Sequence, residues 1–363
     1  MLDSLYIHIP FCTEKCDYCA FYSLPNSDRQ PEYLQRLKEE MQTKRDTCGP
    51  LRSIFVGGGT PNSLSPEHLQ QFLSLIRANF ELADDCEFSM EANPASSTSE
   101  KLDLMTEYGV NRISFGIQSF SPKIRKAIGR TGNINAVYAL LEEARKRKIG
   151  NFSCDLIYGV PGQTPEEWQY DLDQLMAFSP PHVSTYSLMI EQGSRLARQG
   201  ESEGEEELFL EMWEVTEQTF RKQNLQRYEI SNFASPGHQC RHNSEIWYGA
   251  RFMGLGPAAH WFEGDTRWSN PGSLTAWLSG ATPSADELPA KERATEILAI
   301  GLRTVAGWER AQFLAATGFD FLDLRGPEIR QLAEDGLLVL ANTQLRPTLR
   351  GLHLNNYLAS ELL

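Results

Sequence analysis

Three cysteines near the start of the chain have a spacing that suits metal binding. Residues 11–21 read FCTEKCDYCAF, which places Cys12, Cys16 and Cys19 in a C-x3-C-x2-C pattern with no fourth cysteine alongside. A structural zinc site uses four protein ligands, and its cysteines usually come as two C-x2-C pairs, whereas only one such pair occurs here. A cubane iron–sulfur cluster held by three thiolates leaves one iron open to a ligand that arrives later. The spacing favours the cluster, with zinc and chance as the alternatives.

The bulk composition restricts where such a cluster would work. The chain has 363 residues and a net charge of −14, which opposes binding to nucleic acid backbones. It shows no cationic leader and no run of about 18 apolar residues, so we expect a cytoplasmic protein without a membrane span. Seven cysteines, an odd number, point to reduced thiols rather than a disulfide framework. The four remaining cysteines are scattered and are interpreted as small buried hydrophobes: Cys48, Cys86, Cys154 and Cys240.

The elements around the cysteine loop predict an α/β barrel. Strand patterns occur at residues 5–9, 53–59, 86–92, 111–117, 151–159 and 182–188, and helical patterns lie between them. One of these helices opens with a capping box at Thr164 and Glu167. About six βα units predict a parallel sheet closed, or nearly closed, into a TIM-like barrel. We expect residues 1–270 to form the barrel with its extensions, 271–290 a connection, and 291–363 a small, mainly helical C-terminal domain.

Polar residues and glycines gather where the predicted strands end. In such a barrel the chemistry lies on the loops beyond the carboxyl ends of the strands. Three glycines after the second strand would let a ligand approach the backbone closely. An acid within the apolar fifth strand needs a partner or a purpose. The residues at successive strand ends are Gly57, Gly58, Gly59, Thr60, Glu91, Gln118, Arg130 and Asp155, and each alone is also compatible with an ordinary turn or surface residue.

Together these motifs bring a known family into view. The segments YIHIPFCTEKCDYCAF, VGGGTPN, EANP, SFGIQSF, DLIYGVPGQT and YEISNFA with CRHNSEIW resemble the radical S-adenosylmethionine (SAM) enzymes of the oxygen-independent coproporphyrinogen III oxidase type, along essentially the whole chain. The resemblance implies a [4Fe-4S] cluster on the three cysteines, with SAM on the open iron. It implies that one electron cleaves SAM to methionine and a 5′-deoxyadenosyl radical. By motif, the SAM-binding residues would be Tyr6, Gly58, Gly59, Thr60, Glu91, Gln118, Arg130 and Asp155.

Two branches of that family differ at the cysteine loop. The coproporphyrinogen oxidases have a longer segment before the first strand and a fourth cysteine two residues after the third, where this chain has Phe21. The related branch of heme chaperones, HemW, resembles this chain in its C-x3-C-x2-C-x-F pattern and in an H-N-x-x-Y-W motif. Here that motif starts at His242 and ends at Trp247, with Ile246 in place of the usual tyrosine. The chain therefore resembles the heme chaperone branch more closely.

The same motif supplies a candidate heme ligand. His242 can ligate heme iron through a ring nitrogen, with Trp247 packing on the macrocycle. Chemistry alone leaves open a satisfied core histidine, and His8, His238 and His260 as rival ligands. The resemblance favours His242.

We therefore predict a radical SAM-type heme chaperone. It would bind heme and transfer it to an acceptor protein, using the [4Fe-4S] cluster and SAM, and would need an electron donor. The runner-up is an oxygen-independent coproporphyrinogen III oxidase of heme synthesis, and a third reading is another radical SAM enzyme. We expect a monomer or homodimer that binds no nucleic acid, and contact with a membrane-bound acceptor stays open.

Overall fold

The computed structural model describes residues 1–25, 28–130, 132–147, 149–201 and 204–363. Its centre is a nine-stranded sheet in the order β11-β1-β4-β5-β6-β7-β8-β10-β9. The six predicted strands are all present and pair in parallel in sequence order. They are β1 (Leu2–Ile9), β4 (Cys48–Gly58), β5 (Leu82–Ala92), β6 (Arg112–Gln118), β7 (Phe152–Tyr158) and β8 (His182–Ser187). The parallel α/β fold is confirmed.

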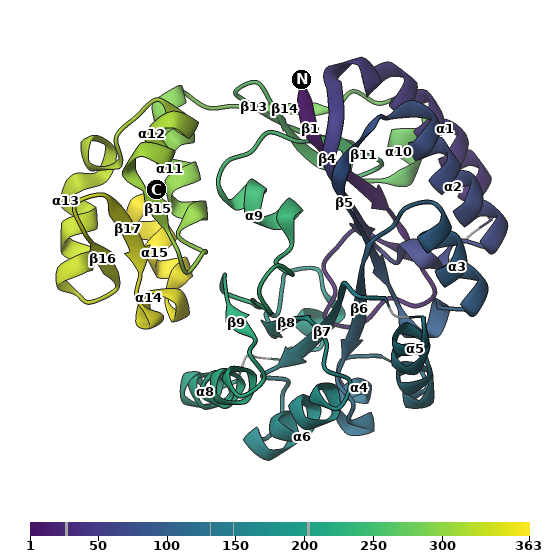
Figure 1. Cartoon of the computed structure of the whole chain (residues 1–363), viewed down its shortest axis with the longest axis horizontal. Helices are drawn as coiled ribbons and strands as arrows, with labels where there is room; N and C mark the ends of the chain where they lie inside the picture. Colours follow the sequence, from purple (N-terminus) through teal and green to yellow (C-terminus); the bar gives the residue numbers. More distant parts are fainter. Residues whose placement is uncertain (26–27, 131, 148, 202–203) are drawn as a thin grey trace.

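Short strands extend the sheet beyond both ends of the predicted set. β11 (Met253–Leu255) pairs in parallel with β1, and β10 (Asn232–Ala234) and β9 (Gln226–Arg227) continue antiparallel from β8. No strand pairing joins β11 to β9 across the described ranges, so the sheet is not closed between these two edge strands. Figure 1 shows this curved sheet with helices along its outer side.

The outer helices bury the apolar face of the sheet. On α2, Leu69, Phe72, Leu73 and Ile76 are buried at helical spacing, and the Ser65 hydroxyl caps the helix by accepting the His68 N–H. The predicted capping box at the start of α6 is confirmed. The outer helices are α1 (Gln30–Lys44), α2 (Pro66–Asn79), α3 (Ser99–Glu107), α4 (Pro122–Ala127), α5 (Ile134–Lys146), α6 (Pro165–Met176) and α8 (Glu206–Arg221), and the short α7 (Arg195–Arg198) lies in the loop after β8.

A short helix lies inside the curve of the sheet. Figure 1 shows α9 (Arg241–Trp247) on the concave side, between the strands and the C-terminal part of the chain. The carboxylate of Glu87 on β5 accepts the backbone N–H groups of Arg241 at 2.9 Å and of His242 at 3.2 Å. These are the unpaired donors of the helix N-terminus, so the buried acid fixes α9 in the barrel.

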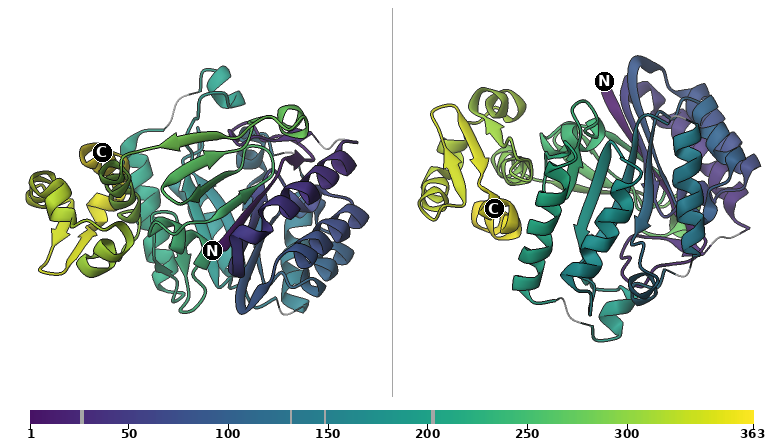
Figure 2. Two further views of the ribbon diagram at one scale, coloured as in Figure 1. Left: turned by 90° about the horizontal axis from the view of Figure 1, so that it is seen from above. Right: turned by 60° about the horizontal axis from the view of Figure 1, so that its bottom comes forward.

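The C-terminal part of the chain forms a second, smaller core. Buried Trp308, Phe313 and Leu345 belong to it, and it lies beside the barrel in Figure 2. Its elements are α11 (Ala290–Gly301), β15 (Trp308–Glu309), α12 (Arg310–Thr317), α13 (Phe321–Glu334), β16 (Leu338–Leu340), β17 (Gln344–Pro347), α14 (Leu349–His353) and α15 (Asn355–Leu362). The predicted boundaries at 270 and 290 stay predictions.

The segment before this core is structured. The strands β12 (His260–Glu263), β13 (Thr266–Ser269) and β14 (Ser284–Glu287) form an antiparallel sheet. α10 (Leu274–Leu278) packs on α1 through Trp277, whose ring lies 5.5 Å from that of Tyr33. Residues 271–290 therefore contain a helix and a strand.

Candidate functional site

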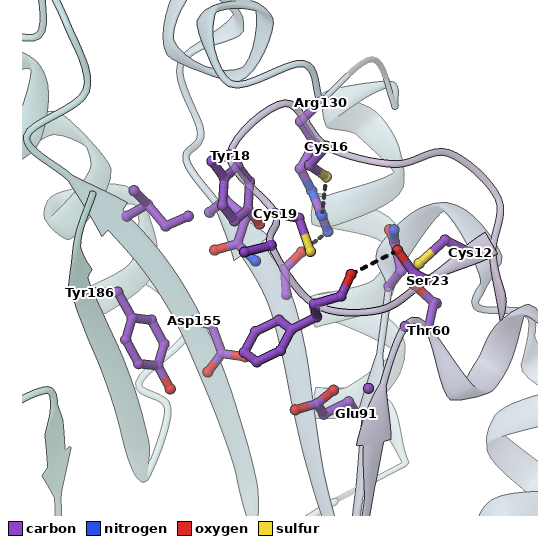
Figure 3. Close-up of a pocket in the computed structure, with 18 of the residues that line it drawn as sticks. Cys12, Cys16, Tyr18, Cys19, Ser23, Thr60, Glu91, Arg130, Asp155 and Tyr186 are labelled. Carbon is purple, nitrogen blue, oxygen red and sulfur yellow. Dashed lines mark hydrogen bonds between the residues drawn. The ribbon is translucent and has the colours of Figure 1, made fainter. Parts of the chain in front are cut away.

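One cavity of about 700 Å³ lies at the carboxyl ends of the parallel strands. It is lined by every residue that the sequence predicted for the cluster and for SAM. These residues are Cys12, Cys16, Cys19, Tyr6, Gly58, Gly59, Thr60, Glu91, Gln118, Arg130 and Asp155. Figure 3 shows the three cysteines with Thr60, Glu91, Arg130 and Asp155 around this cavity. They come from separate loops and strands of the barrel, and the fold brings them into one pocket.

The cysteine loop is held at both of its ends. The short strand β2 (Phe11–Cys12) pairs with β3 (Leu24–Pro25), which closes the loop between them. Thr60 Oγ1 donates to Cys12 Sγ at 3.4 Å, and Arg130 Nη1 donates to Cys16 Sγ at 3.4 Å. A second nitrogen of the Arg130 guanidinium donates to the carbonyl oxygen of Gly116. Hydrogen bonds and a positive charge at the sulfurs favour thiolates and tune an iron–sulfur cluster.

The donor set fits a three-cysteine cluster better than a single zinc ion. Burial raises the pKa of the Cys12 and Cys19 thiols, and metal binding would displace the protons that they hold. Within the described ranges, no group of three or more His, Cys, Asp or Glu side chains converges as a single metal ion requires. Thiolates that bind different irons of a cubane need not converge on one point.

Two carboxyl groups form the polar floor of the pocket. Burial, and to a lesser extent the charge of Asp155, raise the pKa of Glu91 to about 8, while the hydrogen bond from the Gly58 N–H opposes the shift. Burial also raises the pKa of Asp155, although Ser114 Oγ donates to its two oxygens at 3.0 and 3.1 Å. Such a floor suits a ligand that brings hydroxyl or amine donors, because these would satisfy the buried oxygens.

The backbone beside the floor is shaped for close approach. Gly58 has φ of +106°, and a Cβ there would lie 2.7 Å from the His8 ring. A Cβ on Gly59 would lie 2.7 Å from the carbonyl oxygen of Phe11. Only glycine therefore lets the second strand meet the cysteine loop at this distance. Gln118, at the end of β6, also has a positive φ of 72°, an uncommon conformation that turns the chain into the pocket.

The two predicted heme-binding residues lie outside this cavity. His242 is 2% exposed, its ring stacks on Phe55 at 5.4 Å, and its Nδ1 shares a hydrogen bond of 2.9 Å with Ser53 Oγ. Burial lowers its pKa to about 3, so the imidazole is neutral. Trp247 lies at the other end of α9, where the Arg303 guanidinium sits 4.8 Å from its ring.

The rival histidines occupy other places. His8 is buried below the cysteine loop, where its Nε2 shares a hydrogen bond of 2.9 Å with the carbonyl of Tyr22. His238 pairs with Ser235, and His260 is exposed on β12. The geometry alone does not select a heme ligand.

Comparison with known proteins places the chain in a family. The Radical SAM superfamily model matches residues 6–175, and the HemN C-terminal domain model matches residues 288–354. The heme chaperone HemW of Bacillus subtilis is 34% identical, over 98% of this chain and 97% of its own length. The chain belongs to the HemW family. The HemW of Lactococcus lactis is 32% identical, over 98% of this chain and 95% of that protein.

The fold of this HemW-family chain also matches a solved structure. Coproporphyrinogen III oxidase (HemN) from Escherichia coli, described as a radical SAM enzyme, superposes with a TM-score of 0.86. The match covers 99% of this chain and 89% of HemN at 22% identity, so it confirms the fold. In the part of the chain that the structure describes, no helix combines the length and the apolarity needed to cross a membrane.

The pocket of this HemW-family chain also contains side chains that the sequence did not single out. They are Tyr18, Ser23, Tyr186, Met189, Ser231 and Arg303 among others, together with Phe21, which was noted only for replacing a cysteine. Strand alternation could have found Tyr186, because Ser184 on the same face of β8 lies opposite Asp155. Arg303 has no local signal, since it follows a helix of the C-terminal part.

Proposed function

We propose that this HemW-family chain binds heme and transfers it to an acceptor protein. The observation that carries this proposal is the convergence of all predicted cluster and SAM residues in one pocket, in a chain whose near full-length relatives are named heme chaperones. The acceptor protein and an electron donor would be its partners in the cytoplasm, with the chain acting as a monomer or homodimer.

The pocket would hold a [4Fe-4S] cluster and SAM. Cys12, Cys16 and Cys19 would bind three irons, while Thr60 and Arg130 donate to two of the sulfurs. When bound, the reduced cluster and SAM supply one-electron cleavage of the sulfonium. The nucleoside and methionine parts would contact the eight predicted SAM-binding residues, which are Tyr6, Gly58, Gly59, Thr60, Glu91, Gln118, Arg130 and Asp155.

Heme iron would be bound by His242. When Nδ1 carries the proton and donates it to Ser53, Nε2 keeps the lone pair that binds iron. The lowered pKa keeps the ring in this neutral, ligating form. Because the ring is buried behind Phe55, heme binding requires α9 to shift within the barrel, which would also free Trp247 to pack on the macrocycle.

Heme titration of single variants tests this assignment. We expect wild-type protein, reconstituted without oxygen, to saturate at one heme per chain with a sharp absorbance band. His242→Ala should weaken binding by about tenfold or more, which equals at least about 1.4 kcal/mol. His238→Ala, a half-buried histidine away from the pocket, is the matched control and should bind as the wild type does. Unchanged loading of His242→Ala would remove His242 as the ligand.

A further inference from the structure

One wall of the cavity is made of residues outside the predicted cluster and SAM sets. It consists of Tyr186, Met189, Ser231 and Arg303. Figure 3 shows Tyr186 across Asp155 from the cysteine loop. The side chains of Tyr186 and Met189 are 43% and 54% exposed, although both are large and apolar. Exposed apolar groups that line a cavity mark a binding surface, and flexible methionine with aromatic tyrosine suits a flat ligand.

Arg303 reaches this wall from the C-terminal part of the chain. It lies just after α11, and its carbonyl oxygen accepts the Ile230 N–H at 3.1 Å. Val305 N–H donates to the Tyr228 carbonyl at 3.0 Å, and Glu229 forms an isolated β-bridge with Thr304. These backbone bonds join the segment after α11 to the loop between β9 and β10. The position of Arg303 at the pocket is therefore fixed by backbone pairing.

The Arg303 guanidinium has an N–H group without a hydrogen-bond acceptor. Its nearest acid, Glu229, is 4.0 Å away, at the limit of an ion pair. Its Nε is buried and finds no hydrogen-bond acceptor among the described residues. The other cations of the cavity are engaged, because Arg130 donates to Cys16 and Gly116, and Lys15 donates to the Phe21 carbonyl. Among the cations of the cavity, Arg303 is thus best placed to bind an anionic group of a ligand.

Two features identify the kind of ligand. A guanidinium binds a carboxylate with two parallel hydrogen bonds, and the neighbouring apolar surface favours a planar hydrophobic body. The predicted SAM contacts fall within the radical SAM match at residues 6–175, whereas Arg303 falls within the HemN C-terminal match and Tyr186 between the two. The wall is therefore made of residues other than the predicted SAM contacts.

We propose that Arg303 binds a propionate carboxylate of heme, with the macrocycle lying over Tyr186 and Met189. This inference rests on the proposed function, because heme is the ligand that the HemW relatives imply. It adds a specificity residue outside the radical SAM match and is independent of which side chain ligates the iron.

The test compares heme with heme dimethyl ester, which has the same macrocycle but no free carboxylates. Both are titrated by absorbance, in the same cosolvent, against wild-type protein and the Arg303→Gln, Arg303→Lys and Arg251→Gln variants. Arg251 is a matched control, because it also sits over an aromatic ring and pairs with an acid, yet lies outside this cavity.

We expect wild type to bind heme about tenfold more tightly than the ester. Arg303→Gln should bind heme as weakly as the ester while its ester affinity stays unchanged, Arg303→Lys should retain part of the preference, and Arg251→Gln should behave as wild type. Unchanged heme affinity in Arg303→Gln, or an equal loss for heme and ester, would overturn the inference while leaving the heme function intact. Failure of wild type to bind either compound would refute the proposed function itself.

Discussion

The half-buried Glu91 on the pocket floor should make the stability of the protein depend on pH. Glu91 has its pKa raised from 4.5 to about 8, chiefly by burial. A raised carboxyl pKa means that the folded protein holds a proton that the unfolded chain has already lost. Its contribution to stability is therefore complete below about pH 4.5 and is lost as the pH rises toward about 8. Glu91→Gln removes the titration and should remove this loss.

The size of the effect follows from the same shift. The difference between a pKa of 4.5 and one of about 8 would equal about 5 kcal/mol for a fully desolvated carboxylate. Glu91 is only partly buried within an open pocket, so solvent screening reduces this value. We therefore expect the free energy of unfolding of Glu91→Gln to be about 2 kcal/mol higher than that of the wild type at pH 9. Near pH 5 the two proteins should have the same free energy of unfolding.

Urea unfolding of the metal-free, reduced protein at several pH values measures this difference. Glu107→Gln is the matched control, because Glu107 is an exposed acid at the end of α3 and should change stability by less than about 0.5 kcal/mol. The same Glu91→Gln variant should bind SAM more weakly, because SAM would lose one acceptor oxygen and the carboxylate charge at this position. An equal pH dependence in wild type and Glu91→Gln would refute the reasoning about the floor.

Three further changes probe the loop, the strand end and the inner helix. Cys12→Ala should abolish the brown chromophore and the bound sulfide after reconstitution, whereas the control Cys48→Ala should keep both. A brown chromophore in Cys12→Ala would contradict the cluster assignment. Gly58→Ala should lower the free energy of unfolding in urea by about 1–3 kcal/mol and reduce iron loading, because the new Cβ would meet the His8 ring. Gly162→Ala is the control: Gly162 also has a positive φ but has open space around it, so iron loading should stay unchanged. Glu87→Gln should lower the free energy of unfolding by about 1–3 kcal/mol and speed tryptic cleavage after Arg241, because the Glu87 carboxylate accepts the N–H groups at the start of α9. Equal cleavage rates in the variant and the wild type would show that Glu87 does not hold α9.

The sequence predicted the barrel well because its strands are buried apolar runs separated by capped helices. It missed β11, since Met253–Leu255 is only three residues long and pairs with β1 from the far end of the chain. It also missed the position of α9 inside the barrel. That position depends on Glu87, a distant acid whose role no local pattern reveals.

Some residues of the site could likewise be predicted from local motifs, whereas others are placed only by tertiary packing. Strand-end motifs predicted residues that do line one pocket, because parallel strands all present their carboxyl ends to one edge. Arg303 enters the pocket only through backbone pairing between two separate parts of the chain, which leaves no signal in its local sequence. The burial of His242 likewise follows from tertiary packing on Phe55 and Ser53.

We infer that this HemW-family chain carries heme as cargo and does not convert a porphyrinogen as substrate. The most direct measurement divides one anaerobically reconstituted sample, with heme titration by absorbance in one half and coproporphyrinogen III turnover, with SAM and a reductant, in the other. We predict tight binding of one heme per chain and no decarboxylated product. Decarboxylated product, or the absence of saturable heme binding, would contradict the account.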